Sequence, residues 1–138
     1  MSIVIADTHT ILWSIFDPKK LSANALTALT DASRTGTIYI ASITLVELNY
    51  LSTKRNFPYA GALQQIFILA QDPSIPFEVL PLTIDVAKAM DFVPRNEVPD
   101  MPDRIIAAAA VAFKMPLVSV DSDIQSSASL KSLVAVIW

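Results

Sequence analysis

The chain has 138 residues, 53% of them hydrophobic, and a formal net charge of −3. This length fits a single domain over residues 1–138. Such a domain can bury about two-thirds of its unfolded surface and needs no disulfide or structural metal for stability. The absence of cysteine excludes disulfides, thiolate metal sites and a cysteine nucleophile, and the single histidine excludes a multi-histidine zinc site.

The first third of the chain alternates between apolar runs and helical patterns. Residues 3–6 are a continuous apolar run that stops at Asp7, which predicts a buried strand with a polar end. Thr8 is the expected N-cap of the helix that follows, and Ser22 starts a second helix with one apolar face. Residues 37–40 are the second predicted strand.

The middle of the chain predicts two helices and a strand. The first helix starts at Ser42 or Thr44, and Thr44 with Glu47 matches a capping box, in which the two side chains satisfy free N–H groups of the first turn. A second helix is expected from Pro58. Residues 77–80 are the third strand. The helix boundaries in this region rest on the weakest patterns.

The last third repeats the same alternation. Thr83 caps a helix, a proline-rich loop follows over residues 94–102, and Asp103 opens a helix rich in isoleucine and alanine. Residues 117–120 and 133–137 are the fourth and fifth strands. Strands that alternate with helices predict an α/β fold with a mostly parallel sheet of about five strands, flanked by helices.

Charge and hydropathy bear on location and partners. The sequence pI of about 4.9 argues against nucleic-acid binding by charge alone, but cations bound to a cluster of acids would offset that charge. The N-terminus lacks the basic region of a signal peptide, and the longest apolar stretch, residues 105–113, has about half the length that crosses a bilayer. We expect a soluble cytoplasmic protein that makes no membrane contact.

Four acidic residues stand where an α/β chain turns its strand ends toward a shared crevice: Asp7, Glu47, Asp103 and Asp121. Ligands of open α/β sheets bind beyond the carboxyl ends of the strands. Carboxylates gathered there repel one another by roughly 3 kcal/mol per pair at ~5 Å and an effective dielectric of ~20. Such a cluster needs a cation or raised pKa values, so a divalent-metal site is the first hypothesis.

Each acid also has a structural interpretation. Asp7 is a good helix N-cap, and Glu47 is explained by the capping box. Asp103 at a helix start is ordinary, because a carboxylate there meets the positive end of the helix dipole. Asp121 stands directly at a strand end and is favoured over Asp123, which is a lesser candidate. The four positions together make a stronger pattern than any one of them.

These residues resemble the PIN domain superfamily, and within it the VapC-type toxins of bacterial toxin–antitoxin pairs. The matching segments follow the family's order and span nearly the whole chain: VIADTHTILW (4–13), IASITLVEL (40–48), DRIIAA (103–108) and LVSVD (117–121). The proline before Asp103 is shifted by one position from the common pattern of that branch. This departure removes no acid and affects the expected rim of the substrate site.

The resemblance implies a three-layer, Rossmann-like sheet in which Asp7, Glu47, Asp103 and Asp121 converge as catalytic residues and metal ligands for Mg²⁺ or Mn²⁺. It implies hydrolysis of RNA phosphodiester bonds by a metal-activated water. Arg104, Ser119 and Thr8 are the candidate substrate-binding residues. The family also implies a homodimer and a cognate antitoxin protein that blocks the site.

Other residues extend this hypothesis. Basic residues near the crevice are candidate phosphate contacts, although each is individually more typical of a solvated surface: Arg104, Lys54, Arg55 and Arg95. An apolar set lines either a groove, a dimer face or the core: Phe57, Tyr59, Ile66, Phe67 and Leu69.

Three other classes of protein share some of these sequence features. A haloacid-dehalogenase-like phosphohydrolase needs a second Asp two residues after the first, where this chain has His9. A nucleotide-binding enzyme is disfavoured, because two glycines leave no phosphate-cradling loop. The alternative that remains is a catalytically silent module that binds RNA or protein.

Overall fold

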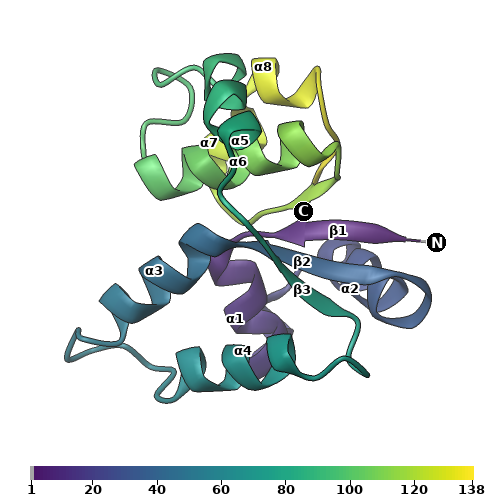
Figure 1. Ribbon diagram of the computed structural model, residues 1–138, viewed down its shortest axis with the longest axis vertical. Helices are drawn as coiled ribbons and strands as arrows, with labels where there is room; N and C mark the ends of the chain where they lie inside the picture. Colours follow the sequence, from purple (N-terminus) through teal and green to yellow (C-terminus); the bar gives the residue numbers. More distant parts are fainter. Residues whose placement is uncertain (1) are drawn as a thin grey trace.

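The computed structural model describes residues 2–138 and shows a five-stranded sheet between helices (Figure 1). Every pair of neighbouring strands is parallel, in the order β3-β2-β1-β4-β5. The strands are β1 (Ile3–Ala6), β2 (Thr37–Ala41), β3 (Phe77–Leu80), β4 (Leu117–Val118) and β5 (Val136–Ile137). This arrangement confirms the predicted α/β fold with a parallel sheet.

Helices follow the strands along the chain. They are α1 (Thr8–Phe16), α2 (Ala23–Thr35), α3 (Ser42–Leu51), α4 (Ala62–Gln71), α5 (Ile84–Ala89), α6 (Met101–Phe113), α7 (Ser122–Ser126) and α8 (Ala128–Lys131), with short 3-10 turns η1 (Pro18–Lys20) and η2 (Met90–Phe92). Within residues 2–138, no helix combines the length and apolar character needed to cross a membrane.

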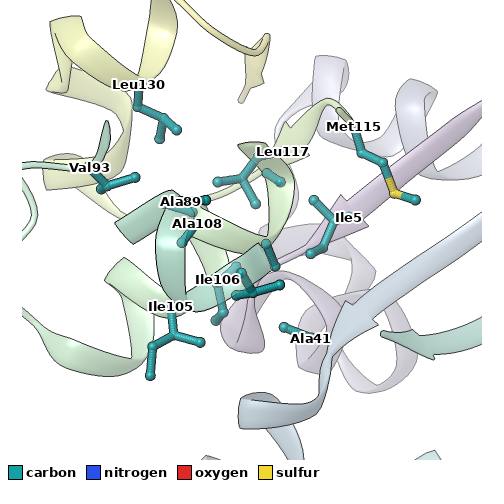
Figure 2. Packing of buried hydrophobic residues seen from close by; sticks show 14 of the residues in the cluster. Ile5, Ala41, Ala89, Val93, Ile105, Ile106, Ala108, Met115, Leu117 and Leu130 are labelled. Carbon is teal, nitrogen blue, oxygen red and sulfur yellow. The ribbon is translucent and has the colours of Figure 1, made fainter. Parts of the chain in front are cut away.

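Two hydrophobic cores lie on the two faces of the sheet. Side chains alternate along a strand, so Val4 of β1 points into one core and Ile5 into the other. Helices α5 to α8 lie on the Ile5 side, and α1, α2 and α4 lie on the Val4 side (Figure 1). Figure 2 shows Ile106 of α6 toward Ile5 of β1 and Ala108 of α6 beside Ala89 of α5, and these branched and small side chains pack α6 into the core on this face of the sheet.

Three predicted elements are shorter than expected, each for a local reason. Helix α4 begins at Ala62 rather than at Pro58, because a turn precedes it and Gly61 adopts a left-handed conformation with φ +78°. Strand β4 stops at Val118, since the backbone then turns into the cleft described below. Strand β5 begins at Val136, because the N–H of Val134 still bonds to the last turn of α8.

The strand order positions the functional edge. Chain connections run outward in one direction from β1 through β2 and β3, and in the other direction through β4 and β5. The point where this order reverses lies between β1 and β4, and open α/β sheets bind ligands in the crevice at that point. Asp7 directly follows β1, and Asp121 comes three residues after β4 ends.

Candidate functional site: an acidic cleft at the sheet edge

A cleft of about 230 Å³ opens at the carboxyl ends of the central strands. All four predicted acids line it, although they come from four separate segments of the chain. The complete lining is Asp7, Thr8, His9, Glu47, Asp100, Asp103, Val120 and Asp121. Asp123 lies exposed in the first turn of α7 and is not among these residues.

Asp7 is the most deeply placed acid, with 3% of its surface exposed. Its Oδ1 accepts a hydrogen bond from the backbone N–H of Thr10 at 2.9 Å, and its Oδ2 accepts one from the Ser119 hydroxyl. Asp7 is therefore the N-cap of α1, and the prediction that Thr8 caps this helix is wrong. Burial raises the pKa of Asp7, and the hydrogen bonds from Ser119 and Thr10 oppose the shift.

Glu47 is held by a pair of buried threonines. The Thr8 hydroxyl donates to Glu47 Oε1 at 2.5 Å and lies 3.1 Å from the Thr44 hydroxyl. A hydroxyl has one proton, so Thr8, which gives its proton to Glu47, must accept from Thr44. Burial raises the pKa of Glu47, against the effect of the Thr8 bond, and the Asp100 charge raises it further.

The predicted capping box at Thr44 and Glu47 is wrong. Helix α3 begins at Ser42 with Ala41 as its N-cap, so Thr44 already stands inside the first turn. Its side chain is fully buried and turns toward Thr8 of α1 rather than toward its own backbone. The residue types fit the capping-box pattern, but the Thr44 hydroxyl bonds to Thr8 of α1 instead of to the backbone of its own helix.

Asp103 stands among like charges. Helix α6 begins at Met101, so Asp103 is its third residue and does not open the helix as predicted. Its backbone N–H bonds at 3.2 Å to Asp100, which is the N-cap. Burial, the Asp121 and Asp100 charges, and then the Glu47 and Asp7 charges raise the pKa of Asp103 to about 8.

Asp100 is a cleft residue that the sequence analysis missed. A signal for it was present, because Pro102 in the first turn of a helix marks an N-cap just upstream. Its charge raises the pKa of both Glu47 and Asp103, so the cleft gathers five carboxylates rather than the four expected.

Ser119 links two of the acids. Its hydroxyl donates to Asp7 and accepts the backbone N–H of Asp121 at 3.1 Å, and its side chain is fully buried. Asp121 in turn caps α7 by accepting the N–H of Ile124 at 2.9 Å. The substrate-binding role expected for Ser119 stays a prediction. The contacts favour a role in positioning the acids.

Arg104 is tied to backbone carbonyls. Its Nε donates to Val93 at 2.6 Å and its Nη2 to Met90 at 2.8 Å, which joins α6 to the turn η2. Within residues 2–138, the single ion pair joins Lys20 to Asp17, so Arg104 does not pair with Asp103. Only the remaining N–H groups of Arg104 are free for the substrate contact predicted for it.

The acids fit a metal ion in donor chemistry, but they do not form a closed cage. All of the donors are carboxylate oxygens, which Mg²⁺ and Mn²⁺ prefer. Among residues 2–138, however, no three Asp, Glu or His side chains converge on a point that a metal ion could occupy. Hydrogen bonds direct Asp7 toward Ser119 and Glu47 toward Thr8, so an ion would have to draw the carboxylates together or keep part of its water shell.

The apolar set from residues 57 to 69 is mostly core. Ile66 is fully buried, and Phe57, Tyr59 and Leu69 pack partly buried against the same cluster. Phe67 differs, with 41% of its surface exposed. Ile66 therefore belongs to the core, and the interpretation as a groove or dimer face stays a prediction for the partly exposed members of the set.

The fold and the cleft define an α/β protein with an acidic site at the reversal of strand order. A family model described as "PIN domain" matches residues 4–129, which is most of the chain. The chain belongs to the PIN domain family. This match confirms the resemblance found in the sequence.

Solved structures of low sequence identity share this fold. A VapBC2 complex from Rickettsia felis bound to a DNA fragment from its promoter has a TM-score of 0.67 at 18% identity, covering 97% of this chain and 96% of that one. A DNA-bound VapBC from Salmonella typhimurium has a TM-score of 0.65 at 21% identity, with 99% and 97% covered. A toxin–antitoxin complex from Klebsiella pneumoniae has a TM-score of 0.61 at 17% identity, with 91% and 93% covered. No curated protein sequence matches significantly.

Proposed function

We propose that this protein is a divalent-metal-dependent endoribonuclease that hydrolyses RNA phosphodiester bonds. One observation carries the proposal: five carboxylates line one cleft, where burial raises the pKa values of Asp7, Glu47 and Asp103, and repulsion from neighbouring acids raises those of Glu47 and Asp103 further. Ionised acids in such a site favour a bound cation, and perturbed acids in a cleft are typical of catalytic sites.

Four residues would hold the ion: Asp7, Glu47, Asp103 and Asp121. When bound, a divalent cation activates water as a nucleophile and stabilises charge that develops on the phosphoryl oxygens. Asp7 would be a ligand already fixed in direction by Ser119 and by the first turn of α1. Asp103 carries no such tether, and its ionisation would depend most strongly on the ion.

Cleavage of total RNA by the purified chain tests this function. With Mg²⁺ or Mn²⁺ we expect cleavage, and with EDTA we expect none. Asp103→Asn, which changes an acid of the cleft, should lose most of this cleavage. Asp123→Asn is its matched control, because Asp123 is exposed in α7 and does not line the cleft. Binding of the metal without any cleavage would support the alternative, a catalytically silent module. Absence of metal binding would contradict the central inference.

We propose further that the chain is the toxin of a toxin–antitoxin pair, acts in the cytoplasm, forms a homodimer and binds an antitoxin protein. The similar VapBC structures are complexes of this kind, which supports an antitoxin partner. Phe67 and Ile68 of α4 are 41% and 60% exposed and offer an apolar surface for a protein partner. Growth arrest on expression, relieved by coexpressing a small protein encoded beside this gene, would support the toxin role. Unaffected growth together with metal-dependent cleavage in vitro would argue for a nuclease of another kind.

A further inference from the structure

One stripe of helix α3 runs from the core through the cleft to the surface. Ile43, Glu47 and Tyr50 follow one another at spacings of four and three residues, which places them on the same side of the helix. Ile43 packs against the core that contains α6, and Glu47 lines the cleft. Neighbours at this spacing have Cβ atoms about 5–6 Å apart, so Tyr50 is the next residue after Glu47 on this side of α3, outside the residues that line the cleft.

The side chain of Tyr50 is highly exposed to solvent for an aromatic residue. Its side chain is 63% exposed, and the Lys54 ammonium lies 4.9 Å from the centroid of its ring. Lys54 continues the spacing of the stripe, just past the C-terminal end of α3. The neighbourhood of an acidic cleft is therefore marked by an exposed aromatic face and a positive charge, although the chain as a whole is negative.

We propose that Tyr50 and Lys54 form a nucleotide subsite, in which Tyr50 stacks on an unpaired base beside the bond being cut and Lys54 contacts its phosphate. The inference rests on the proposed ribonuclease function and adds to it a determinant of substrate binding. Single-stranded nucleic acid is bound in this way, by aromatic rings that accept base faces and by basic residues that follow the backbone.

Two features favour RNA over a protein partner at this place. A cleft of five carboxylates repels phosphates, so a substrate needs positive charge nearby, and Lys54 supplies it beside Tyr50. Because the ammonium lies over the Tyr50 ring, a base that stacks on the exposed remainder of the ring would bring its phosphate close to Lys54. The exposed ring of Phe67 on α4, in contrast, has no Lys or Arg over it within residues 2–138.

The test uses a short single-stranded RNA that carries 2-aminopurine, a base whose fluorescence falls when it stacks. Binding is measured to the full chain in Ca²⁺, and a gel checks that the RNA stays intact. We expect the unmodified chain to quench the fluorescence. Tyr50→Leu should bind the RNA about tenfold more weakly and cause no quenching, whereas Tyr50→Trp should keep both the affinity and the quenching. Phe92→Leu is the matched control, because Phe92 is 59% exposed but lies outside α3 and the cleft.

Lys54→Gln tests the phosphate contact separately. Loss of one phosphate contact to single-stranded RNA lowers the slope of log affinity against log salt by about 0.7. An unchanged slope would overturn the assignment of Lys54. Circular dichroism spectra of every variant, compared with that of the unmodified chain, show whether the fold is kept.

The outcomes separate this inference from the function on which it rests. If the unmodified chain cuts total RNA with Mg²⁺ while Tyr50→Leu binds the probe equally well, the subsite is wrong and the nuclease stands. If the unmodified chain neither cuts nor binds RNA, both are wrong. If Tyr50→Leu dissociates a dimer in light scattering without changing RNA affinity per subunit, the ring serves a protein contact and the subsite is overturned.

Discussion

Asp7 and Asp103 line the same cleft but are held in different ways. Asp7 is buried, and each of its oxygens accepts a hydrogen bond, so its direction is fixed before any ligand arrives. Asp103 is half-buried, and burial, followed by repulsion from Asp121, Asp100, Glu47 and Asp7, raises its pKa. Hydrogen bonds fix the first acid, whereas burial and neighbouring charges control the ionisation of the second. Substitutions at the two positions should therefore have different effects on activity, metal affinity and stability.

The largest effect is expected at Asp103. Asp103→Asn should lower RNA cleavage by more than about 100-fold, since even the loss of an outer partner of a metal ligand costs about 10–100-fold. The same change should raise the melting temperature of the metal-free protein at pH 8, because it removes one of the mutually repelling charges. Cleavage assays and thermal unfolding measure the two effects. A loss of both activity and stability would mean that Asp103 is a structural residue.

Ser119→Ala should weaken the Asp7 half of the site. Asp7 loses a buried donor, which costs about 1–3 kcal/mol of stability, and Mg²⁺ affinity should fall by about 10–100-fold. Urea unfolding and calorimetric titration measure these changes. Ser126→Ala is the matched control, because Ser126 is exposed and a surface change of this kind stays within about 0.5 kcal/mol. Unchanged metal affinity in Ser119→Ala would show that this hydrogen bond does not position Asp7.

A smaller effect is expected at Thr44, which reaches the cleft only through Thr8. Thr44→Val removes the donor to Thr8 and lets the hydroxyl that holds Glu47 rotate. We expect about a tenfold loss in metal affinity, at the low end for an outer partner, and recovery in Thr44→Ser, which keeps the hydroxyl. Equal defects in both variants would indicate that the methyl group and its packing matter rather than the hydrogen bond.

A further expected effect is a dependence of stability on pH. The pKa of Asp103 is about 8 in the folded chain and about 3.9 in an unfolded one, so its contribution is full below about pH 4 and is lost as the pH rises to 8. The raised pKa values of Asp7 and Glu47 act in the same direction. Without metal, the melting temperature should therefore fall between pH 5 and pH 8.

Two further measurements test the cause of this fall in melting temperature with pH. Asp103→Asn should flatten the fall in melting temperature, because it removes the carboxyl group whose pKa is raised to about 8. Saturating Mg²⁺ should reverse it, because the ion binds the ionised carboxylates and stabilises the folded chain more as the pH rises. A melting temperature that rises with pH in EDTA would contradict the raised pKa values.

The comparison of Asp7 with Asp103 also shows why part of the site escaped the sequence analysis. The sequence indicates three of the acids, Asp7, Asp103 and Asp121. Each stands near the end of an apolar run or the start of a helix, and such positions can be recognised from the sequence alone. Asp100 gives a weaker signal than the neighbouring Asp103, which matches the family pattern. Asp7 and Asp121 each serve both as a helix N-cap and as a cleft residue, since a side chain at a helix start can do both.

The sequence by itself determined the alternation of strands and helices, the acids at the strand ends and the family. These features follow from local periodicity and from short motifs. Only the tertiary structure decided that Thr8 holds Glu47, that Ser119 joins Asp7 to Asp121, and that Arg104 is tied to carbonyls. The physical reason is that a polar side chain takes whichever partner burial leaves within reach, and burial is set by the packing of distant segments.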